Sequence, residues 1–464
     1  MDFTKVDQLL AEMYPQMEED LCGMLRFASI KAEPLPNAPF GKEIADTLEY
    51  CLKMSERLGL SCGNVDGYMV YADLPGATAE QVGVLGHVDV VPANAADWTY
   101  PPFSAKVADG KIYARGTTDD KGPMVAALYG ALALQKAGIP LTKTVRFLYG
   151  GDEESGFGCI KYYLTKHVPP SCGFSPDGKF PVVMAEKGIV RYQLTANWSA
   201  ECCADSNLSK LVSVGSGQAV NIVPDIAEAV FDAAPGSALE DLSKLPDIEV
   251  EVGLGKVIVI AKGKAGHASR PDDGDNALAK LFAALATVDF APAGAKQYLD
   301  TLARLFADSR YGETLGVADK DEHSVLTTVP SMMTLTETGG SLTCDMRFPV
   351  TRKMADLEQK VLAICAENGL ELAKWDGSEP MFLGPDSSIV QSLLKAYRGY
   401  TGDNTEPFVM GGGTYARSVP NHAAFGPEYP LQEQLAHQAD EYITQEQLLD
   451  IAKIYARAIY ELAK

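Results

Sequence analysis

Histidine and carboxylate residues follow two stretches that are typical of buried strands. His87 comes directly after the apolar residues 81–86, with Asp89 two positions later, and the adjacent Glu153 and Glu154 follow a second apolar stretch. Ligands bind at the carboxyl ends of strands in open α/β sheets, so we expect these side chains at one sheet edge. An imidazole there, with Asp89 able to accept its second ring N–H, is suited to holding a metal ion. The alternative is a histidine in a plain turn.

The adjacent glutamates could divide the work of a hydrolytic site. One carboxylate would ligate a metal ion, while the other would accept a proton as a general base. A solvated acidic turn is the alternative interpretation, and for these two residues alone it is the simpler one.

Three further clusters contain carboxylate or imidazole side chains. Asp119 and Asp120 precede a predicted helix, Asp177 lies in a Ser-Pro-Asp-Gly sequence, and His437 precedes an acidic segment. Taken singly, these positions are explained as a helix N-cap, a β-turn and the start of a surface helix. Together, imidazoles and hard carboxylate oxygens without a thiolate favour zinc, manganese or cobalt, and they argue against a structural zinc–cysteine cluster.

The elements that must position these residues change in type along the chain. In the first third, amphipathic helices alternate with strands, which predicts an α/β sheet with parallel strands. The predicted helices cover residues 7–27, 42–58 and 123–136, and the predicted strands cover residues 81–86 and 144–149.

The middle of the chain has an α+β pattern with antiparallel character. Strand-like segments are residues 191–195, 248–252, 257–262 and 341–348, and helical segments are residues 276–287, 296–307 and 354–368. The α/β pattern returns from about residue 383 and ends in an amphipathic helix over residues 444–462. We therefore predict an α/β domain over residues 1–186 and 383–464. It is interrupted by an α+β domain over residues 187–382, which is long enough to hold two similar halves.

The composition limits the classes of partner. The 464-residue chain carries 62 acidic and 40 basic residues, and its formal net charge of −22 argues against nucleic acid or an anionic membrane as a partner. No signal segment is visible at the N-terminus, and the longest apolar stretch, residues 123–134, is too short to span a bilayer. Nine scattered cysteines without a CxxC pair, Cys202 and Cys203 among them, indicate reduced thiols in a cytoplasmic protein.

Five blocks of the sequence resemble the motifs of one enzyme family, in the family's order. They are Gly86-His-Val-Asp-Val-Val-Pro92, Arg115-Gly-Thr-Thr-Asp-Asp-Lys-Gly122, Gly151-Asp-Glu-Glu-Ser155, Pro176-Asp-Gly178 and Ala436-His437. The family is that of the two-metal exopeptidases and deacylases, which includes aminoacylases, carboxypeptidase G and the PepV-type dipeptidases. Gly411-Gly-Gly-Thr-Tyr-Ala-Arg417 and Phe425-Gly-Pro427 look most similar to the PepV-type (Xaa-His, carnosinase-like) bacterial dipeptidases.

The resemblance implies two bound divalent ions, zinc in the first instance, with manganese or cobalt as alternatives. The implied ligands are His87 and Asp177 for one ion, Glu154 and His437 for the other, and Asp119 as a bridge between them. A cis peptide bond would join Asp119 to Asp120, and Asp89 would orient His87. Glu153 would be the general base that makes a metal-bridging hydroxide from water and then protonates the leaving amine.

The resemblance also implies that the inserted domain supplies substrate contacts. His267, in a glycine-flanked loop, could donate to the developing oxyanion, and Arg347 could pair bidentately with a substrate carboxylate. The remaining substrate-binding candidates are Asn221, Gly412, Gly413 and Thr414. On the residues alone, His267, Arg347 and Asn221 are an ordinary loop histidine, a strand-surface arginine and a turn asparagine. The glycine run Gly411 to Gly413 would let the backbone approach a bound dipeptide.

We therefore predict a cytoplasmic dipeptidase that hydrolyses unblocked dipeptides. Its fold would be α/β: a mixed-sheet zinc-exopeptidase domain with an inserted, doubled ferredoxin-like α+β lid. A doubled lid could supply His267 within the same chain, so we expect a monomer. An N-acyl-amino-acid deacylase or carboxypeptidase of the same family is the alternative, and a non-catalytic binding protein on the same fold is a second one. His167, His323 and His422 are interpreted as structural.

Overall fold

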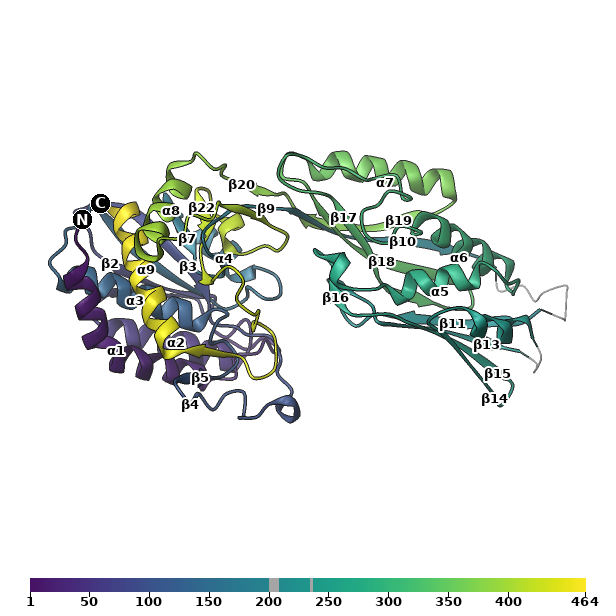
Figure 1. Ribbon diagram of the computed structural model, residues 1–464, viewed down its shortest axis with the longest axis horizontal. Helices are drawn as coiled ribbons and strands as arrows, with labels where there is room; N and C mark the ends of the chain where they lie inside the picture. The colour runs from purple at the N-terminus through teal and green to yellow at the C-terminus, as the bar shows by residue number, and fades with distance from the viewer. Residues whose placement is uncertain (200–207, 234–236) are drawn as a thin grey trace. The chain divides into compact units, whose positions relative to one another are not determined.

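The computed structural model describes residues 1–199, 208–233 and 237–464, and these residues form two units (Figure 1). The first unit contains Met1–Ala185, Phe382–Phe408 and Gly413–Lys464, and the second contains Glu186–Met381 and Val409–Gly412. The second unit is therefore an insertion that interrupts the chain of the first.

The first unit is built on a mixed sheet. Its strands lie in the order β1 (Ser61–Val65), β2 (Met69–Leu74), β6 (Lys143–Gly150), β3 (Thr78–His87), β7 (Cys172–Ser175), β22 (His422–Ala424), β9 (Val183–Glu186) and β20 (Met381–Phe382). β3 pairs in parallel with β6 and β7, and β22 pairs in parallel with β7. β2 pairs antiparallel with both β1 and β6. The predicted α/β class with a mixed sheet is confirmed.

Helices cover this sheet. α1 (Thr4–Leu25), α3 (Lys121–Lys136) and α9 (Gln445–Ala463) pack together, and α8 (Ser388–Thr401) packs against α9. α2 (Lys42–Arg57) contacts β1 and β2, and α4 (Gly158–Lys166) contacts β2. Successive residues are buried at the carboxyl ends of β3 and β6, so both faces of the sheet are covered there.

α3 and α9 approach each other closely. Every residue of α3 from Lys121 to Leu134 is buried, which fits a helix that is apolar nearly all round. A Cβ atom at Gly130 would lie 2.9 Å from the main-chain oxygen of Ala452 and 2.9 Å from the main-chain nitrogen of Ala456. Because only glycine fits at that position, the helix that begins two residues after Asp119 packs directly against the backbone of α9.

Two short sheets flank the main sheet of the first unit. β24 (Tyr442–Thr444), β5 (Lys111–Tyr113) and β4 (Lys106–Ala108) form one of them, and β8 (Gly178–Lys179) with β23 (Pro427–Glu428) forms the other. Both bring C-terminal residues beside segments from the first 180 residues.

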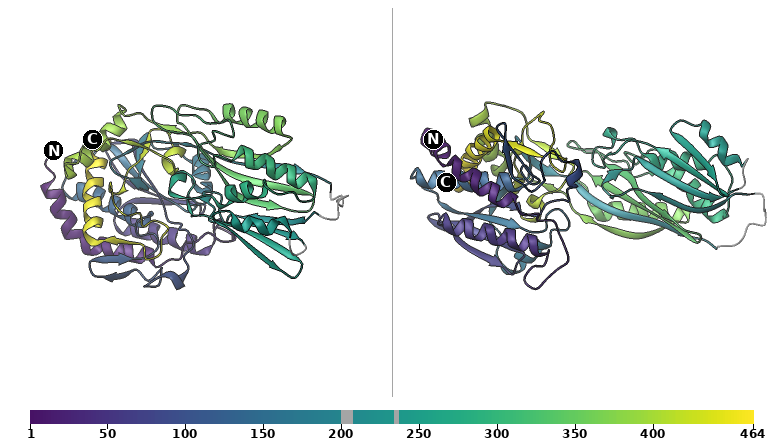
Figure 2. Two further views of the ribbon diagram at one scale, coloured as in Figure 1. Left: turned by 45° about the vertical axis from the view of Figure 1, so that its right-hand side comes forward. Right: turned by 90° about the horizontal axis from the view of Figure 1, so that it is seen from below.

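The second unit is an antiparallel sheet of eight strands with helices on one face (Figure 2). The order is β14 (Ile248–Gly253), β15 (Lys256–Lys262), β13 (Ile226–Asp232), β11 (Lys210–Ser216), β17 (Thr327–Leu335), β18 (Gly339–Phe348), β10 (Gly188–Asn197) and β19 (Glu371–Ser378). α5 (Ala277–Leu285), α6 (Ala293–Leu305) and α7 (Met354–Asn368) share one apolar core with this sheet.

This sheet has two halves, which join where β11 pairs with β17. In one half, β10, α6, β17, β18, α7 and β19 follow a β-α-β-β-α-β order along the chain, the ferredoxin-like arrangement. The other half, β11, β13, β14 and β15 with α5, is inserted between β10 and α6 and has a different strand order. The predicted ferredoxin-like arrangement is therefore present in one half of the lid. The other half extends the sheet without repeating that topology, so the lid is not a doubled ferredoxin-like unit.

Among the residues that the structure describes, no helix combines the length and the apolar character that crossing a bilayer requires. The seven cysteines in the described ranges are all free thiols, and Cys202 and Cys203 lie outside those ranges.

Candidate metal centre

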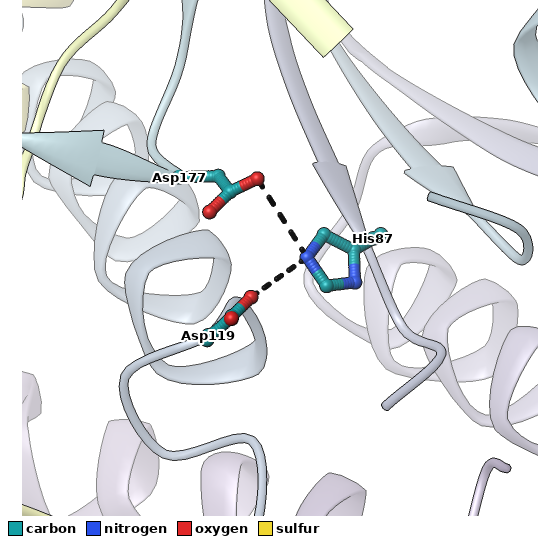
Figure 3. A group of neighbouring side chains, drawn as sticks. All are labelled: His87, Asp119 and Asp177. Atoms are coloured by element: carbon teal, nitrogen blue, oxygen red, sulfur yellow. Dashed lines mark hydrogen bonds and ion pairs between the residues drawn. The ribbon is translucent and has the colours of Figure 1, made fainter. Parts of the chain in front are cut away.

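The sheet of the first unit brings His87 and Asp177 together. His87 is the last residue of β3, and Asp177 lies two residues after the neighbouring parallel strand β7. Nε2 of His87 is 3.9 Å from Oδ2 of Asp177 and 3.0 Å from Oδ1 of Asp119, and both carboxylates point toward it (Figure 3). These three residues form the first of two groups whose ligand atoms all lie within 4.8 Å of one another.

Asp119 belongs to the second group as well. Its Oδ2 atom lies 3.0 Å from Nε2 of His437, and the same nitrogen lies 3.1 Å from Oε1 of Glu154. Asp119 therefore presents one oxygen to each histidine, the geometry expected of a residue shared by two sites. The peptide bond between Asp119 and Asp120 is cis, as the family resemblance implies. The structure thus brings all five predicted ligands into two adjoining groups.

Charge balance in these groups favours a cation. Burial raises the pKa of the Glu154 carboxyl, and the nearby Asp119 adds to that rise. Burial opposes protonation of His437, but its hydrogen bonds with Asp119 and Glu154 outweigh burial and raise its pKa to about 11. A positive charge beside these clustered carboxylates would therefore stabilise them, and divalent ions would supply that charge.

Glu153 stands beside the two groups and belongs to neither. It is buried, and its Oε1 atom has no hydrogen-bond partner among residues 1–199, 208–233 and 237–464. Burial and the neighbouring Asp177 raise its pKa well above the usual value. A non-ligating carboxylate with an unpaired oxygen and a raised pKa is suited to accept a proton. Together with the two ligand groups, it fits a site for hydrated divalent ions.

Asp89 accepts from His87 through its main-chain oxygen and not, as predicted, through its carboxylate. Nδ1 of His87 lies 2.9 Å from the main-chain oxygen of Asp89 and 3.6 Å from its Oδ1 atom, so the nearest acceptor is the carbonyl. The Asp89 carboxylate instead accepts the main-chain N–H groups of Glu153 and Glu154, each at 3.1 Å. Asp89 therefore orients both the imidazole and the turn that carries the two glutamates.

The second unit brings Asn221 and His267 together. The short strands β12 (Ile222–Val223) and β16 (Gly266–His267) pair with Ile222 opposite His267, and the main-chain oxygen of Asn221 accepts from the nitrogen of Ala268 at 2.9 Å. The main-chain N–H of Ser269 points at Nδ1 of His267 at 3.2 Å. Because a main-chain N–H can only donate, Nδ1 is an acceptor and the ring proton lies on Nε2.

One side of the Arg347 guanidinium is hydrogen-bonded to the Asp345 carboxylate. Nε and Nη2 donate to the Asp345 carboxylate at 2.5 and 2.9 Å, and Nη1 donates to the main-chain oxygen of Gly411 at 3.1 Å. Only the remaining N–H groups of Nη1 and Nη2 are available for the predicted contact with a substrate carboxylate. Asp345, two positions earlier on the same face of β18, is the partner that the sequence analysis missed.

The predicted glycine run is divided between the two units. Gly412 belongs to the second unit, and Gly413 and Thr414 belong to the first. The Thr414 hydroxyl accepts from the nitrogen of Ala416 at 3.1 Å and so caps a short 3-10 helix, Tyr415–Ser418. Thr414 therefore has a local structural task beside its predicted role in substrate binding.

Glu441 is a second residue that the sequence analysis missed. Its carboxylate is buried beside the segment that leads to Asp119, where it forms an ion pair with Arg115. The signal available in the sequence was its position four residues after His437 in the acidic Gln-Ala-Asp-Glu segment.

A family model described as Peptidase family M20/M25/M40 matches residues 83–461 of this chain. Among curated proteins, "Putative dipeptidase YtjP" of Bacillus subtilis (strain 168) is 36% identical over 452 residues, covering 95% of this chain and 96% of that protein. Among solved structures, human carnosine dipeptidase 1 aligns with a TM-score of 0.60 at 14% identity, covering 100% of this chain and 99% of that one. An M20 family metallo-carboxypeptidase from Sulfolobus solfataricus aligns with a TM-score of 0.58 at 16% identity, covering 96% and 99%. The two structural matches show a common fold.

Proposed function

The chain belongs to peptidase family M20/M25/M40, and on that premise we propose that it is a metal-dependent dipeptidase that hydrolyses unblocked dipeptides. A curated relative that matches over nearly the whole chain carries the name of a dipeptidase, which supports this proposal. The observation that carries it is the arrangement of two ligand groups around one shared carboxylate, with a non-ligating carboxylate beside them.

Divalent metal ions are the cofactors of this family, and this chain offers a donor set of imidazole and carboxylate for two of them. In the proposal, His87, Asp119 and Asp177 hold one ion, and Asp119, Glu154 and His437 hold the other. Zinc is the first candidate because it prefers such nitrogen and oxygen donors, with manganese and cobalt as alternatives.

Divalent ions in such a site polarise the scissile carbonyl and lower the pKa of water. The protein's own contribution to proton transfer is assigned to Glu153. Its raised pKa lets it take the proton of the attacking water and hand it to the leaving amine nitrogen. Asp89 supports this role because it holds the main-chain N–H groups of Glu153 and Glu154 in place.

The proposed substrate contacts come from the inserted unit and the glycine run. His267, with its proton on Nε2, is assigned to the developing oxyanion, and Arg347 is assigned to the substrate carboxylate. Asn221, Gly412, Gly413 and Thr414 are the remaining assigned contacts. We further propose that one chain supplies both Glu153 and His267. Chains of Glu153→Ala mixed with chains of His267→Ala should stay inactive, and recovered activity would place His267 across a subunit boundary.

The second candidate function is an N-acyl-amino-acid deacylase or a carboxypeptidase of the same family. The fold does not separate it from a dipeptidase, because both kinds of enzyme share this fold. Alanyl dipeptides with a free amine, compared with their N-acetylated forms, distinguish the two. The dipeptidase proposal predicts a higher kcat/KM for the free dipeptides, and a preference for the acetylated forms would favour the deacylase.

The proton-transfer role is tested with Glu153→Gln, which keeps the shape of the side chain. We expect kcat to fall on the order of 100- to 10,000-fold, with the metal content unchanged. Glu433→Gln, a change of an exposed carboxylate close in sequence to His437, is the matched control and should retain wild-type turnover. Near-normal turnover of Glu153→Gln would refute the assigned role.

A further inference from the structure

Glu441 is a buried carboxylate whose hydrogen bonds reach the segment that leads to Asp119. Its side chain is 0% exposed. Oε2 accepts from Nη1 of Arg115 at 2.7 Å. Oε1 accepts from the main-chain nitrogens of Gly116 and Thr118 at 3.1 and 2.9 Å, and from the hydroxyls of Thr117 and Thr118 at 3.3 and 3.0 Å. Five donor groups from four consecutive residues therefore surround one carboxylate, and the Thr117 hydroxyl is shared with the main-chain oxygen of Ala114 at 3.0 Å.

Main-chain contacts join the same two segments. The nitrogen of Ala114 donates to the main-chain oxygen of Glu441 at 3.1 Å, and Nη1 of Arg115 also donates to the main-chain oxygen of Gln438 at 3.0 Å. Directly beyond these contacts, β24 pairs antiparallel with β5. The chain around His437 and the chain before Asp119 are thus held together on both sides of Glu441.

The two ligand groups differ in what fixes their members. His87 ends β3 and Asp177 closely follows β7, so the hydrogen bonds between these paired strands set their separation. Asp119 and His437 are 318 positions apart and lie outside the helices and strands, with His437 in the left-handed backbone region at φ 66°. Nevertheless Oδ2 of Asp119 and Nε2 of His437 lie 3.0 Å apart. The contacts of Glu441 supply the fixed spacing that paired strands supply for the first group.

We propose that Glu441 is a positioning residue that sets the affinity of the Asp119–Glu154–His437 group for its metal ion. Loss of its contacts loosens two of the three ligands of that group. In the other group it loosens only Asp119, because His87 and Asp177 remain fixed by the strands. The inference rests on the proposed metal roles, and its signature is selective weakening of one of two ions.

The test measures metal binding directly and does not depend on turnover. Metal-free wild type, Glu441→Gln and Asp20→Asn are titrated with zinc in competition with a chromophoric chelator, and the thermal unfolding of each metal-free sample is recorded. In Glu441→Gln, an amide N–H₂ faces either Arg115 or the main-chain donors, so buried donors lose their acceptor. Asp20 is the matched control: its buried carboxylate pairs with Arg57 and accepts from the Tyr129 hydroxyl at 2.6 Å, and it touches neither ligand group.

We expect wild type to bind two ions per chain. In Glu441→Gln the first ion should bind with near wild-type affinity and the second on the order of 10- to 100-fold more weakly. Asp20→Asn should unfold at a lower temperature and bind both ions as wild type does. Unchanged affinities in Glu441→Gln, equal weakening of both ions, or the same selective loss in Asp20→Asn would overturn the inference. A wild-type chain that binds fewer than two ions would instead overturn the two-site proposal, and the inference with it.

A milder variant covers the case in which Glu441→Gln does not fold. Thr118→Val removes one hydroxyl donor and keeps the pair of Glu441 with Arg115. Its second ion should bind several-fold more weakly, and unchanged binding of both ions by the folded variant would overturn the inference.

Discussion

His422 should make the first unit lose stability as the pH falls. The residue lies in β22, inside the main sheet, and its side chain is 0% exposed. Nδ1 donates to the main-chain oxygen of Pro420 at 2.7 Å, whereas Nε2 has no hydrogen-bond partner in the part of the chain that the structure describes. Cβ atoms at Gly83 and Gly173 would come within 2.8 and 2.7 Å of Nε2, so the ring fills the space that these two glycines leave.

The magnitude follows from the pKa of this histidine. Burial lowers the pKa of His422 from 6.5 to about 4, so the folded protein keeps the ring neutral where the unfolded chain protonates it. The contribution to stability is therefore present above pH 6.5 and is lost as the pH falls toward 4. Because the pKa is about 4 in the folded protein and 6.5 in the unfolded chain, proton linkage lowers the free energy of unfolding by about 2 kcal/mol at about pH 5, relative to neutral pH.

Denaturant unfolding of the metal-free protein at about pH 7 and about pH 5 measures this loss. We expect His422→Gln to be less stable than wild type at pH 7 but to lose about 2 kcal/mol less on acidification. His167→Gln, at a partly exposed histidine that stacks on Tyr163, is the matched control and should follow wild type. If wild type and His422→Gln lose the same free energy between the two pH values, the reasoning about His422 is refuted.

Three further predictions concern packing, substrate binding and metal binding. Gly130→Leu should destabilise the first unit by about 1–3 kcal/mol or more, because its side chain would meet the backbone of α9, and an unchanged melting temperature would contradict this packing. Arg347→Lys should raise KM for dipeptides while zinc content stays at the wild-type level, because one ammonium cannot serve Asp345 and a substrate carboxylate together. Zinc at about 100 times the dissociation constant of each site should add about 2.7 kcal/mol per bound ion to the unfolding free energy of the metal-free protein, and Asp119→Ala should lose most of that gain.

Hydrophobic periodicity was sufficient for many of the elements. The helix predicted over residues 354–368 has those bounds in the structure, and Gly369 ends it in the left-handed region. The strand predicted over residues 81–86 is the buried core of β3. The prediction missed β13 and β17. The ferredoxin-like arrangement of the lid was available only through the family resemblance, because no local pattern shows how strands far apart in the sequence pair.

The sequence predicted which residue types make up the site better than it predicted which of them contact one another. His87 ends a strand and Glu153 and Glu154 follow one, so the position of each was visible in the local pattern. The association of Asp119 with His437 depends on pairing between β5 and β24, which no local pattern encodes, and only the family resemblance indicated it.

One of the contacts that the prediction missed had no signal in the sequence, whereas the pairing of Arg347 did have one. The main-chain oxygen of Asp89 that accepts from His87 is invisible in a side-chain pattern. The pairing of Arg347 with Asp345 was predictable, because residues two apart on a strand share a face.

The most direct test of the central claim is a zinc titration of the metal-free chain during hydrolysis of an unblocked alanyl dipeptide. Two ligand groups that share Asp119 predict that hydrolysis rises and saturates as the second ion per chain binds. Hydrolysis that saturates at one ion per chain would contradict the account, and so would bound zinc without hydrolysis at any ratio.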